Sequence, residues 1–409
     1  MDESVIVGID IGTTKICTLV GRGEENGRLR ILGAGVEPSR GIRKGAVVDL
    51  AGASQAIRHS VDKAERTSGL EIKSALVSLA GAQISALNSP GVVGISGRAI
   101  DEDDVARAMD AARAVAVPHN QEIIHIIQRN FTVDGQDGIR TPIGMHGYRL
   151  EVETHIITAS TSTVENLRQC VADSGIEVTQ FVLAPLASAE MALTDPEREM
   201  GVIACDIGSG TTDLSIYIEG DVWHTAILPI GGGHITSDIA HGLRLSADVA
   251  ETIKIKHAHA DLTEVPAEEY FTVQSFGEGN PIQVSRQDVA HITGARVEEI
   301  FSLVQQEIKR SGYDGLLPAG MVLTGGTALL PGIRKVAGEV LEMPVRIAKP
   351  ENLIGMTDQL LSPAFATGVG LLKWAMLMNE IAFQPGRRRM FSEGVNWEKV
   401  KDLLRRLLP

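Results

Sequence analysis

The sequence has 409 residues and a mass of 43.7 kDa, which suits two or three domains better than a single core. Its 52 acidic residues outnumber its 38 basic residues, and the net charge of −14 argues against a nucleic-acid binder, which needs a basic face for phosphates. Three scattered cysteines without C-x-x-C spacing exclude a disulfide scaffold and a structural zinc site. We read no signal peptide and no uninterrupted apolar run of about 18 residues, so we expect a cytoplasmic α/β protein.

A hairpin-like segment occurs twice in the sequence. The segment VIVGIDIGTTKICTLVG (5–21) returns as VIACDIGSGTTDLSIYIEG (202–220). Each copy has an apolar run that closes on Asp-Ile-Gly, a turn of small residues and a second alternating strand. Matching the Thr-Thr pairs of the two copies gives the second turn two extra residues, Ser209 and Gly210. The repeat predicts two duplicated domains.

Between the two copies, the predicted elements divide into a main fold and an insertion. A helix over residues 50–69 and a strand over residues 74–81 continue the main fold. Residues 83–161 have a pattern of their own: a strand, a helix opened by acidic residues, and two long alternating strands. This β-α-β-β order predicts a small inserted domain. The main fold resumes with a helix at which Ser162 and Glu165 have the spacing of a capping box.

After the second copy, the pattern is mainly helical as far as about residue 310. A short apolar strand at 320–326 then leads to a helix interrupted by Pro331-Gly332. The last core helix is predicted over 361–378, and residues 385–394 have the composition of a linker.

The two Asp-Ile-Gly turns together predict a nucleotide held between two domains. Glycines let backbone N–H groups approach phosphate oxygens, and threonine hydroxyls add donors. Asp10 and Asp206 are expected at strand ends, where carboxylates hold Mg²⁺, usually through its waters. Lys15 adds a point charge for a terminal phosphate. Either turn alone is compatible with an ordinary tight hairpin, but two matched copies favour phosphate loops. The candidate phosphate residues are Asp10, Gly12, Thr13, Thr14, Lys15, Asp206, Gly208, Ser209, Gly210, Thr211 and Thr212, with Asp10 and Asp206 for the metal.

Two further motifs suit the adenosine end of ATP. The turn Gly325-Gly326-Thr327 follows an apolar strand, and its glycines permit a flat group such as adenine to approach the backbone. Glu251 and Lys254 are three residues apart, so they share a helix face and can reach ribose hydroxyls or the purine edge. Taken singly, the turn is an ordinary loop and the pair an ordinary surface ion pair. The two phosphate loops are what favour the binding interpretation.

The end of the chain has a charge opposite to that of the rest. Residues 387–409 hold seven basic and three acidic residues, a net charge of +4 against −18 for the remaining chain. A predicted helix over 395–409 places apolar side chains on one face and basic ones around it, which is typical of a helix in a membrane interface. The alternative is a terminal helix that docks on the protein's own core or on a partner. The predicted membrane residues are Trp397, Val400, Lys401, Leu403, Leu404, Arg405, Arg406, Leu407 and Leu408.

These motifs together resemble the superfamily of actin, heat-shock chaperone and sugar kinase ATPases, and within it the FtsA family of bacterial actin-like cell-division proteins. VGIDIGTTKICTLVG (7–21) is similar to the first phosphate loop of that family, and DIGSGTTDLSIY (206–217) to its second. VLTGGTALLPG (322–332) is similar to its adenosine loop and FATGVGLL (365–372) to a connecting helix. The resemblance implies an actin-like ATPase fold, with two duplicated domains around a nucleotide cleft and with ATP and Mg²⁺ as ligands.

The resemblance also implies a division of the chain. The expected parts are a first core subdomain (1–82 and 162–200), an inserted FtsA-type SHS2 subdomain (83–161), a second core subdomain (201–232 and 311–384), its smaller lobe (233–310), a linker (385–394) and the amphipathic membrane helix (395–409).

One departure from the superfamily concerns hydrolysis. Actin and the chaperones have a glutamine or glutamate on the first connecting helix that helps to orient the attacking water. The matching stretch here places Ala184 at that position, and a methyl group cannot polarise water. Glu190 lies six residues further on, across the helix. We therefore expect a slow ATPase at most.

As a member of that family, the protein would polymerise on the inner face of the plasma membrane at the division site. It would anchor the tubulin-like FtsZ there and recruit later division proteins through residues 83–161. By position, Arg286, Arg296 and Glu299 resemble the residues of that family that contact the FtsZ peptide; the alternative is that they are ordinary solvated helix charges. Alternative functions on the same fold are a small-molecule kinase of the sugar type and a pilus-assembly ATPase. The kinase would need a carboxylate base beside a substrate pocket, and no such motif was found.

Overall fold

The computed structural model describes residues 5–24, 27–274, 281–383 and 391–393. The chain divides into two compact units. The described residues of unit 1 come from segments 5–82, 166–220 and 225–376, and those of unit 2 come from 83–165, 221–224 and the residues after 376.

The first sheet of unit 1 has six strands in the order β11-β6-β1-β2-β3-β19. They are β1 (Val5–Ile11), β2 (Lys15–Gly23), β3 (Leu29–Pro38), β6 (Ser74–Leu79), β11 (Glu177–Leu183) and β19 (Leu353–Gly355). Strands β1 and β2 form an antiparallel hairpin, and β1 also pairs in parallel with β6. A small hairpin of β4 (Ile42–Arg43) and β5 (Ala46–Val47) follows β3.

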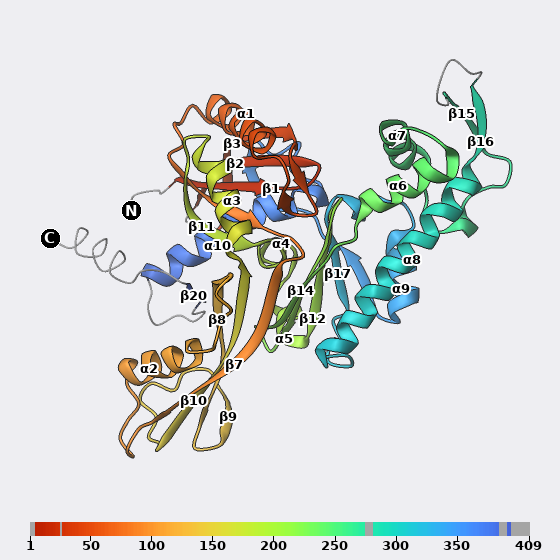
Figure 1. Ribbon diagram of the computed structural model, residues 1–409. Coiled ribbons are helices and arrows are strands. Elements are labelled where there is room, and N and C mark those ends of the chain that lie inside the picture. The colour runs from red at the N-terminus through yellow and green to blue at the C-terminus, as the bar shows by residue number, and fades with distance from the viewer. Residues whose placement is uncertain (1–4, 25–26, 275–280, 384–390, 394–409) are drawn as a thin grey trace. The chain divides into compact units, whose positions relative to one another are not determined.

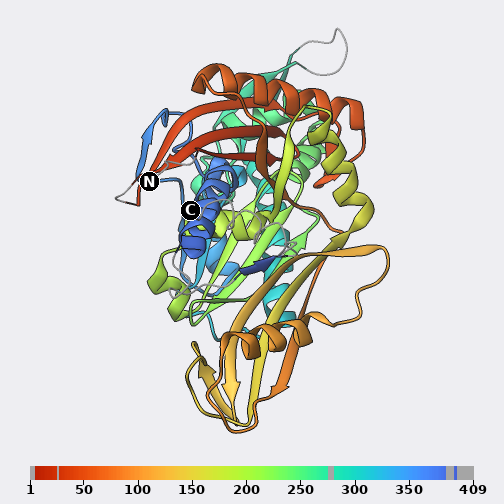
Figure 2. The same cartoon turned by 90° about the vertical axis from the view of Figure 1, so that its left-hand side faces the viewer.

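Helix α1 (Leu50–Ser68) covers this sheet and packs on β2 and β3 (Figure 2). The Asp49 side chain accepts a hydrogen bond from the Gly52 N–H at 3.2 Å, and Gly69 ends the helix with φ 71°. The predicted helix over 50–69 is thus confirmed.

The second sheet of unit 1 repeats this arrangement, in the order β14-β13-β12-β17-β18. Its strands are β12 (Val202–Ile207), β13 (Thr212–Ile218), β14 (Asp221–Leu228, of which residues 225–228 belong to unit 1), β17 (Met321–Thr324) and β18 (Val345–Ile347). As in the first sheet, the two strands of a hairpin, β12 and β13, are antiparallel, and β12 pairs in parallel with the next strand of the core, β17. The predicted duplication is therefore confirmed by topology as well as by sequence.

Two helices pack against the sheets and against each other. Helix α4 (Ala184–Ala192) contacts strands of both, and α10 (Ala366–Phe383) packs Leu371 against Gly8 of β1. The two helices cross at Gly370, where a Cβ would lie 1.8 Å from the Ala187 carbonyl oxygen, so only glycine fits. Short helices α5 (Asp195–Met200) and η3 (Pro363–Phe365) precede β12 and α10.

The rest of unit 1 is helical around one hydrophobic core. It contains α6 (Gly232–Leu243), α7 (Ala247–His257), η1 (Leu262–Glu264), α8 (Arg286–Ser311), η2 (Gly326–Leu329) and α9 (Ile333–Leu341). Between η1 and α8, the strands β15 (Tyr270–Val273) and β16 (Ile282–Ser285) form a hairpin. The sequence pattern, which was interpreted as mainly helical up to residue 310, did not predict this hairpin.

Unit 2 is a sheet covered on one face by helix α2 (Figure 1). The elements are β7 (Ile84–Gly94), α2 (Glu102–Arg113), β8 (Gln121–Val133), β9 (Gln136–Ile139), β10 (Arg149–Ser160) and β20 (Phe391–Glu393), with a strand order of β20-β8-β10-β7 and β9 paired to β8. Asp101 and Asp104 form a capping box at the start of α2, and its Ala112 lies against Gly91 of β7. The predicted β-α-β-β order is confirmed, with the small strand β9 added.

Two local predictions differ from the structure. Helix α3 (Thr161–Ala172) begins one residue before Ser162, so Ser162 lies inside the helix, where its hydroxyl contacts Ser160, and it is not the N-cap. Residues 391–393 of the predicted linker form β20, which pairs with β8. Among the residues that the structure describes, no helix has both the length and the apolar character to cross a membrane.

Candidate functional site

The two repeated hairpins have turns of the same length. The last paired residues are Ile11 with Ile16 in the first hairpin and Ile207 with Thr212 in the second, so four residues lie between them in each. The same backbone hydrogen bond closes both turns, from Gly12 N to Lys15 O and from Gly208 N to Thr211 O, each at 3.0 Å. The match of Thr-Thr pairs in the sequence was therefore wrong.

The pairing makes different residues equivalent in the two hairpins. Asp10 and Asp206 remain equivalent, since they pair with Cys17 and Asp213 respectively. Lys15 corresponds to Thr211, and Cys17 corresponds to Asp213. Asp213 did not belong to the predicted site, and the corrected turn length is the signal that would have singled it out.

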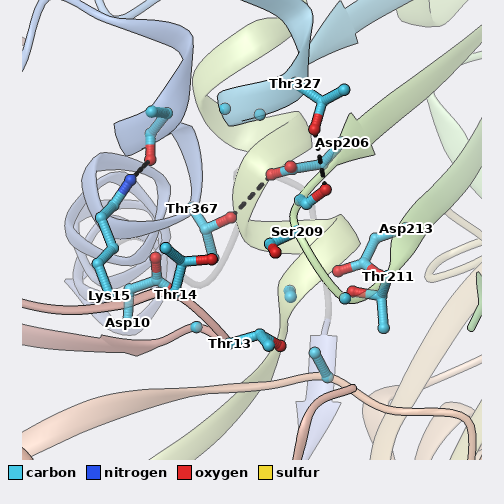
Figure 3. A pocket seen from close by; sticks show the side chains of 18 of the residues that line it. Asp10, Thr13, Thr14, Lys15, Asp206, Ser209, Thr211, Asp213, Thr327 and Thr367 are labelled. Carbon is cyan, nitrogen blue, oxygen red and sulfur yellow. Dashed lines mark hydrogen bonds between the residues drawn. The ribbon is translucent and has the colours of Figure 1, made fainter. Parts of the chain in front are cut away.

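Both turns line one cavity within unit 1, with a volume of about 440 Å³ (Figure 3). This size is within the usual range for a small-molecule site. The predicted residues that line it are Asp10, Gly12, Thr13, Thr14, Lys15, Asp206, Gly208, Ser209, Gly210, Thr211, Glu251, Lys254, Gly325, Gly326 and Thr327. Lining residues that were not predicted as binding residues include Ser78, Ala184, Asp213, Ala364 and Thr367.

Thr212 is the one predicted nucleotide residue that does not line the cavity. Its side chain is fully buried, and its hydroxyl donates to the Ile230 carbonyl at 2.8 Å. Residues alternate in direction along a strand, so Thr212 points away from the side on which Thr211 and Asp213 lie.

Besides Glu251, three aspartates line this cavity: Asp10, Asp206 and Asp213. The Ser78 hydroxyl donates to Asp10 at 2.9 Å. Thr367 donates to Asp206 at 2.9 Å (Figure 3). Desolvation raises the pKa of Asp10, and burial together with the nearby charge of Asp10 raises the pKa of Asp206 to about 6. Burial, and then the charge of Asp206, raises the pKa of Asp213 well above its usual value. A cation bound among these groups would offset their mutual repulsion.

The carboxylates suit a hard cation such as Mg²⁺. Asp213 is 6% exposed, and its Oδ1 has no hydrogen-bond partner among the described residues. A buried oxygen of this kind requires a water or an ion. In the described part of the chain, no three acidic, histidine or cysteine side chains lie close enough to ligate one ion directly. An Mg²⁺ ion here would therefore keep part of its water shell, as it usually does beside phosphates.

Lys15 is the cation of the first turn. Its ammonium group donates to the Ala364 carbonyl and lies 4.2 Å from the centroid of the Phe365 ring. An ammonium has three protons, so two remain for a phosphate. The short helix η3 thus holds Lys15 at the cavity wall.

The glycine turn after β17 lies against the second hairpin. Gly325 has φ 89°, and a Cβ there would lie 2.3 Å from Asp206 Oδ1. At Gly326 the nearest atom to a Cβ would be Ala364 Cβ at 3.7 Å, which leaves space on the cavity side. The Thr327 hydroxyl donates to Gly208 O at 3.0 Å and fixes the glycine turn to the turn of the second hairpin.

Ala184 is the first residue of α4 and presents its methyl group to the cavity. Glu190 does not line the cavity; it pairs with Arg198 at 2.7 Å. Among the described residues that line the cavity, the glutamine or glutamate that orients water in actin therefore has no counterpart on α4.

The residues assigned to the FtsZ peptide lie on α8, away from this cavity, and each already has partners. Arg286 pairs with Glu269 and donates to the His257 carbonyl at 3.0 Å. Arg296 contacts both carboxylate oxygens of Asp238, at 2.5 and 2.8 Å, and also pairs with Glu299. The predicted membrane residues, from Trp397 to Leu408, lie outside the described residues.

Comparisons with known proteins give the family. A family described as "Cell division protein FtsA" matches residues 203–370, and one described as "SHS2 domain inserted in FTSA" matches residues 81–158. FtsA of Pseudomonas aeruginosa is 43% identical, with 91% of this chain and 89% of that protein covered. FtsA of Bacillus subtilis is 40% identical (91% and 84% covered), and FtsA of Escherichia coli K12 is 36% identical (91% and 90% covered).

Solved structures show the fold. A PilM-PilN type IV pilus biogenesis complex matches with a TM-score of 0.64 at 16% identity, covering 90% of this chain and 97% of the other. MreB5 of Spiroplasma citri bound to ADP matches with a TM-score of 0.57 at 15% identity, covering 93% and 99%. The fold is that of the actin-like ATPases. The chain belongs to the FtsA family of cell division proteins, with an actin-like fold and an inserted SHS2 domain.

Proposed function

We propose that the protein binds Mg²⁺·ATP in the cavity between the two hairpins. The observation that carries this proposal is the convergence of two matched turns on one cavity that is also lined by Lys15 and by the three aspartates Asp10, Asp206 and Asp213. The phosphates would lie between the turns, where backbone N–H groups and Lys15 are available, and Asp10, Asp206 and Asp213 would hold the waters of the metal. The base would lie against Gly325 and Gly326.

Titration with a fluorescent ATP analogue tests this assignment. Binding should require Mg²⁺, and Gly326→Val should weaken it because the added bulk occupies the space for the base. Unchanged binding in Gly326→Val, or equal binding with and without Mg²⁺, would contradict it.

The function of this ATP-binding protein, in our proposal, is that of a filament-forming membrane adaptor for cell division. It anchors FtsZ to the inner face of the plasma membrane through residues 395–409, and it recruits later division proteins through the inserted subdomain. Membership of the FtsA family and the basic amphipathic sequence at the end of the chain support this. A net charge of +4 gives a single copy weak attraction to anionic lipid, and a filament raises the apparent affinity by about 10²–10⁴ through avidity.

Sedimentation with anionic liposomes tests the adaptor role. With ATP present, the full chain should bring FtsZ into the liposome pellet. Trp397→Glu or Leu404→Glu should release it, because a charge would then lie on the apolar face of the helix. A chain without residues 395–409 should bind nucleotide but not liposomes. If the shortened chain still sedimented with liposomes, the anchor would lie elsewhere.

The proposed FtsZ contact at α8 depends on residues that are already paired within the protein. A peptide that binds Arg296 would have to share it with Asp238 or replace Glu299. Charge reversal at Arg296 should lower the affinity for the FtsZ carboxyl-terminal peptide without changing ATP binding. Glu299→Ala tests Glu299 apart from Arg296: peptide affinity should fall if Glu299 itself contacts the peptide, and should rise if Glu299 only occupies Arg296.

Hydrolysis should be slow, since the α4 position that faces the cavity is Ala184. Phosphate release at many turnovers per second would contradict this part of the proposal.

A further inference from the structure

One short segment of the chain contacts three separate parts of the cavity wall. It comprises residues 363–367, which are η3 and the first two residues of α10, and we call it the η3–α10 junction. Its first contact is with the glycine turn after β17. The Pro363 carbonyl accepts a hydrogen bond from the Gly325 N–H at 3.2 Å, and Ala364 Cβ is the atom nearest to a Cβ at Gly326. The junction therefore packs directly on the turn that would hold the base.

The second contact of the junction is with the cation of the first hairpin. Lys15 Nζ donates to the Ala364 carbonyl and lies 4.2 Å from the centroid of the Phe365 ring. The face of an aromatic ring attracts an ammonium group through its quadrupole. The carbonyl and the ring are both uncharged, so they fix the ammonium group of Lys15 in place and leave its full charge for a phosphate.

The third contact is with a carboxylate of the second hairpin. The hydroxyl of Thr367, which is 9% exposed, donates to Asp206 Oδ2 at 2.9 Å (Figure 3). In the part of the chain that the structure describes, no other group donates to this carboxylate. Thr367 thus sets the orientation of Asp206 through one oxygen, and the other oxygen, Oδ1, is left to accept from a metal-bound water.

The duplicated fold offers a hydroxyl beside each aspartate, but only the first half uses it. Asp10 accepts from Ser78 of β6, the strand parallel to β1. In the second half, Asp206 pairs with Thr324 of β17, the corresponding parallel strand. The Thr324 hydroxyl, however, lies 3.2 and 3.3 Å from two backbone carbonyls, and Asp206 is not among its partners in the described chain. The second aspartate therefore depends on Thr367, a donor from outside its own sheet.

We propose that the η3–α10 junction is the positioning element of the site. Thr367 orients the carboxylate of Asp206 toward the waters of the metal, and Phe365 holds Lys15 toward the phosphates. Thr367 and Phe365 act through other side chains, so both are positioning residues. A single short segment thereby fixes the cation of one hairpin and the carboxylate of the other relative to each other. This inference rests on the proposed Mg²⁺·ATP site.

The two positioning residues should differ in how their loss depends on the metal. Thr367 acts on Asp206, which favours ATP only when the metal is present, because without the metal a carboxylate repels the phosphates. Phe365 acts on Lys15, which meets a phosphate directly, so its loss should weaken binding with or without the metal. A merely structural role of the junction would leave the ratio of ATP affinities with Mg²⁺ and in EDTA unchanged in both variants.

The test is calorimetric titration of the full chain with ATP, once with Mg²⁺ and once in EDTA. Thr367→Val keeps the shape of the side chain without its hydroxyl and should lower the ratio of the two affinities by about five- to tenfold. Thr367→Ser should restore it. Phe365→Leu should lower both affinities by about two- to fivefold and leave their ratio at the wild-type value. Phe365 is only half-buried, so this variant remains available if Thr367→Val folds poorly.

Thr324→Val is the matched control, because it removes a buried hydroxyl that lies beside Asp206 in the sheet without donating to it. Its ratio should be that of the wild type even if the protein becomes less stable. An unchanged ratio in Thr367→Val, an equal loss in Thr324→Val, or unchanged affinities in Phe365→Leu would overturn the inference while leaving the ATP site intact. A wild-type protein that did not bind ATP, or bound it equally with and without Mg²⁺, would instead overturn the proposed function, and this inference with it.

Discussion

The two hairpins of unit 1 share a backbone but differ in chemistry. Each has an aspartate at the end of its first strand and a four-residue turn closed by the same hydrogen bond. In the first hairpin, the equivalent positions of the second strand hold Lys15 and Cys17, and in the second hairpin they hold Thr211 and Asp213. The backbone of the repeat therefore supplies the proposed phosphate-binding turn twice, whereas Lys15 comes from the first copy only and the additional carboxylate, Asp213, from the second.

Because of this difference, the two hairpins contribute different charges to the cavity. Lys15 lies at the η3 side, held by Ala364, and Asp206 and Asp213 pair across the second hairpin. A phosphate chain would place its negative charge near Lys15, and a metal ion would lie toward the second hairpin. The variants below test this asymmetry, beginning with the largest expected effect.

Gly325→Ala should be the most damaging single change to the second hairpin. The residue has φ 89°, and its Cβ would lie 2.3 Å from Asp206 Oδ1 and 2.5 Å from Ile207 O. Strain and overlap together should lower the free energy of unfolding by about 2–4 kcal/mol. Urea denaturation measures this loss, and ATP binding should fall with it.

Gly326→Ala is the matched control for that variant. Its Cβ would have only Ala364 Cβ nearby, at 3.7 Å, and its φ is not in the left-handed region. Stability should change by less than about 1 kcal/mol. Equal destabilisation by the two variants would show that the turn does not lie against the second hairpin as described.

Asp206→Ala and Asp10→Ala should weaken Mg²⁺·ATP binding by about ten- to a hundredfold, since each removes a charged hydrogen-bond acceptor for metal-bound water. In EDTA, the two variants should instead bind ATP more tightly than the wild type, because without the metal these carboxylates repel the phosphates. Asp261→Ala, which removes an ion pair with Lys335 outside the cavity, should bind ATP as the wild type does. A loss of affinity that persists in EDTA would argue against a role in metal binding.

Local sequence patterns predicted much of the fold because they reflect local physics. The alternating apolar runs, the helix predicted over residues 50–69 and the acidic start of α2 each depend on residues close together in the sequence, and all appear in the structure as expected. The turn length was predicted wrongly, because the two sequences were aligned on their Thr-Thr pairs. The hydrogen bond that closes each turn instead makes Lys15 equivalent to Thr211. Asp213 was missed for this reason alone.

Sequence patterns did not predict contacts between segments that are far apart in the chain. Thr236 joins Glu251 and Lys254 from another helix, and no spacing rule connects α6 to α7. Ser162 had the spacing of a capping box, but the chain enters the helix directly from β10, one residue earlier. In both cases tertiary structure decides which donor meets which acceptor.

The acidic end of the cavity should make the protein without ligand less stable as pH rises. Burial raises the pKa of Asp206 to about 6, above its ordinary value of 3.8. The unfolded chain therefore releases this proton first, and stability is lost as pH rises from about 4 to about 6. A shift of two pKa units corresponds to on the order of 2–3 kcal/mol. Unfolding midpoints in urea, measured without metal or nucleotide, would show this loss.

Asp206→Asn isolates the contribution of this one group. The amide can still accept from Thr367 but does not ionise, so the variant should be more stable than the wild type at pH 8 and similar to it at pH 4. Saturating Mg²⁺·ATP should remove the advantage, because a bound cation offsets the charge of Asp206. A variant less stable than the wild type at pH 8 without ligand would contradict this account of the carboxylates.

The smallest expected effect separates two adjacent threonines of the second hairpin. Thr212→Val removes a buried hydroxyl that donates to Ile230 O, leaving that carbonyl without its donor, which should cost about 1 kcal/mol of stability. It should not alter ATP affinity, since Thr212 faces away from the cavity. Thr211→Val should affect both properties: its hydroxyl lies in the cavity wall and hydrogen-bonds to Asp213, so ATP binding should weaken by about two- to threefold and stability should also fall by about 1 kcal/mol. Titration and urea denaturation of both variants therefore test the register of the turn directly. If Thr212→Val weakened ATP binding and Thr211→Val did not, the equivalence of Lys15 with Thr211 and of Cys17 with Asp213 would be wrong.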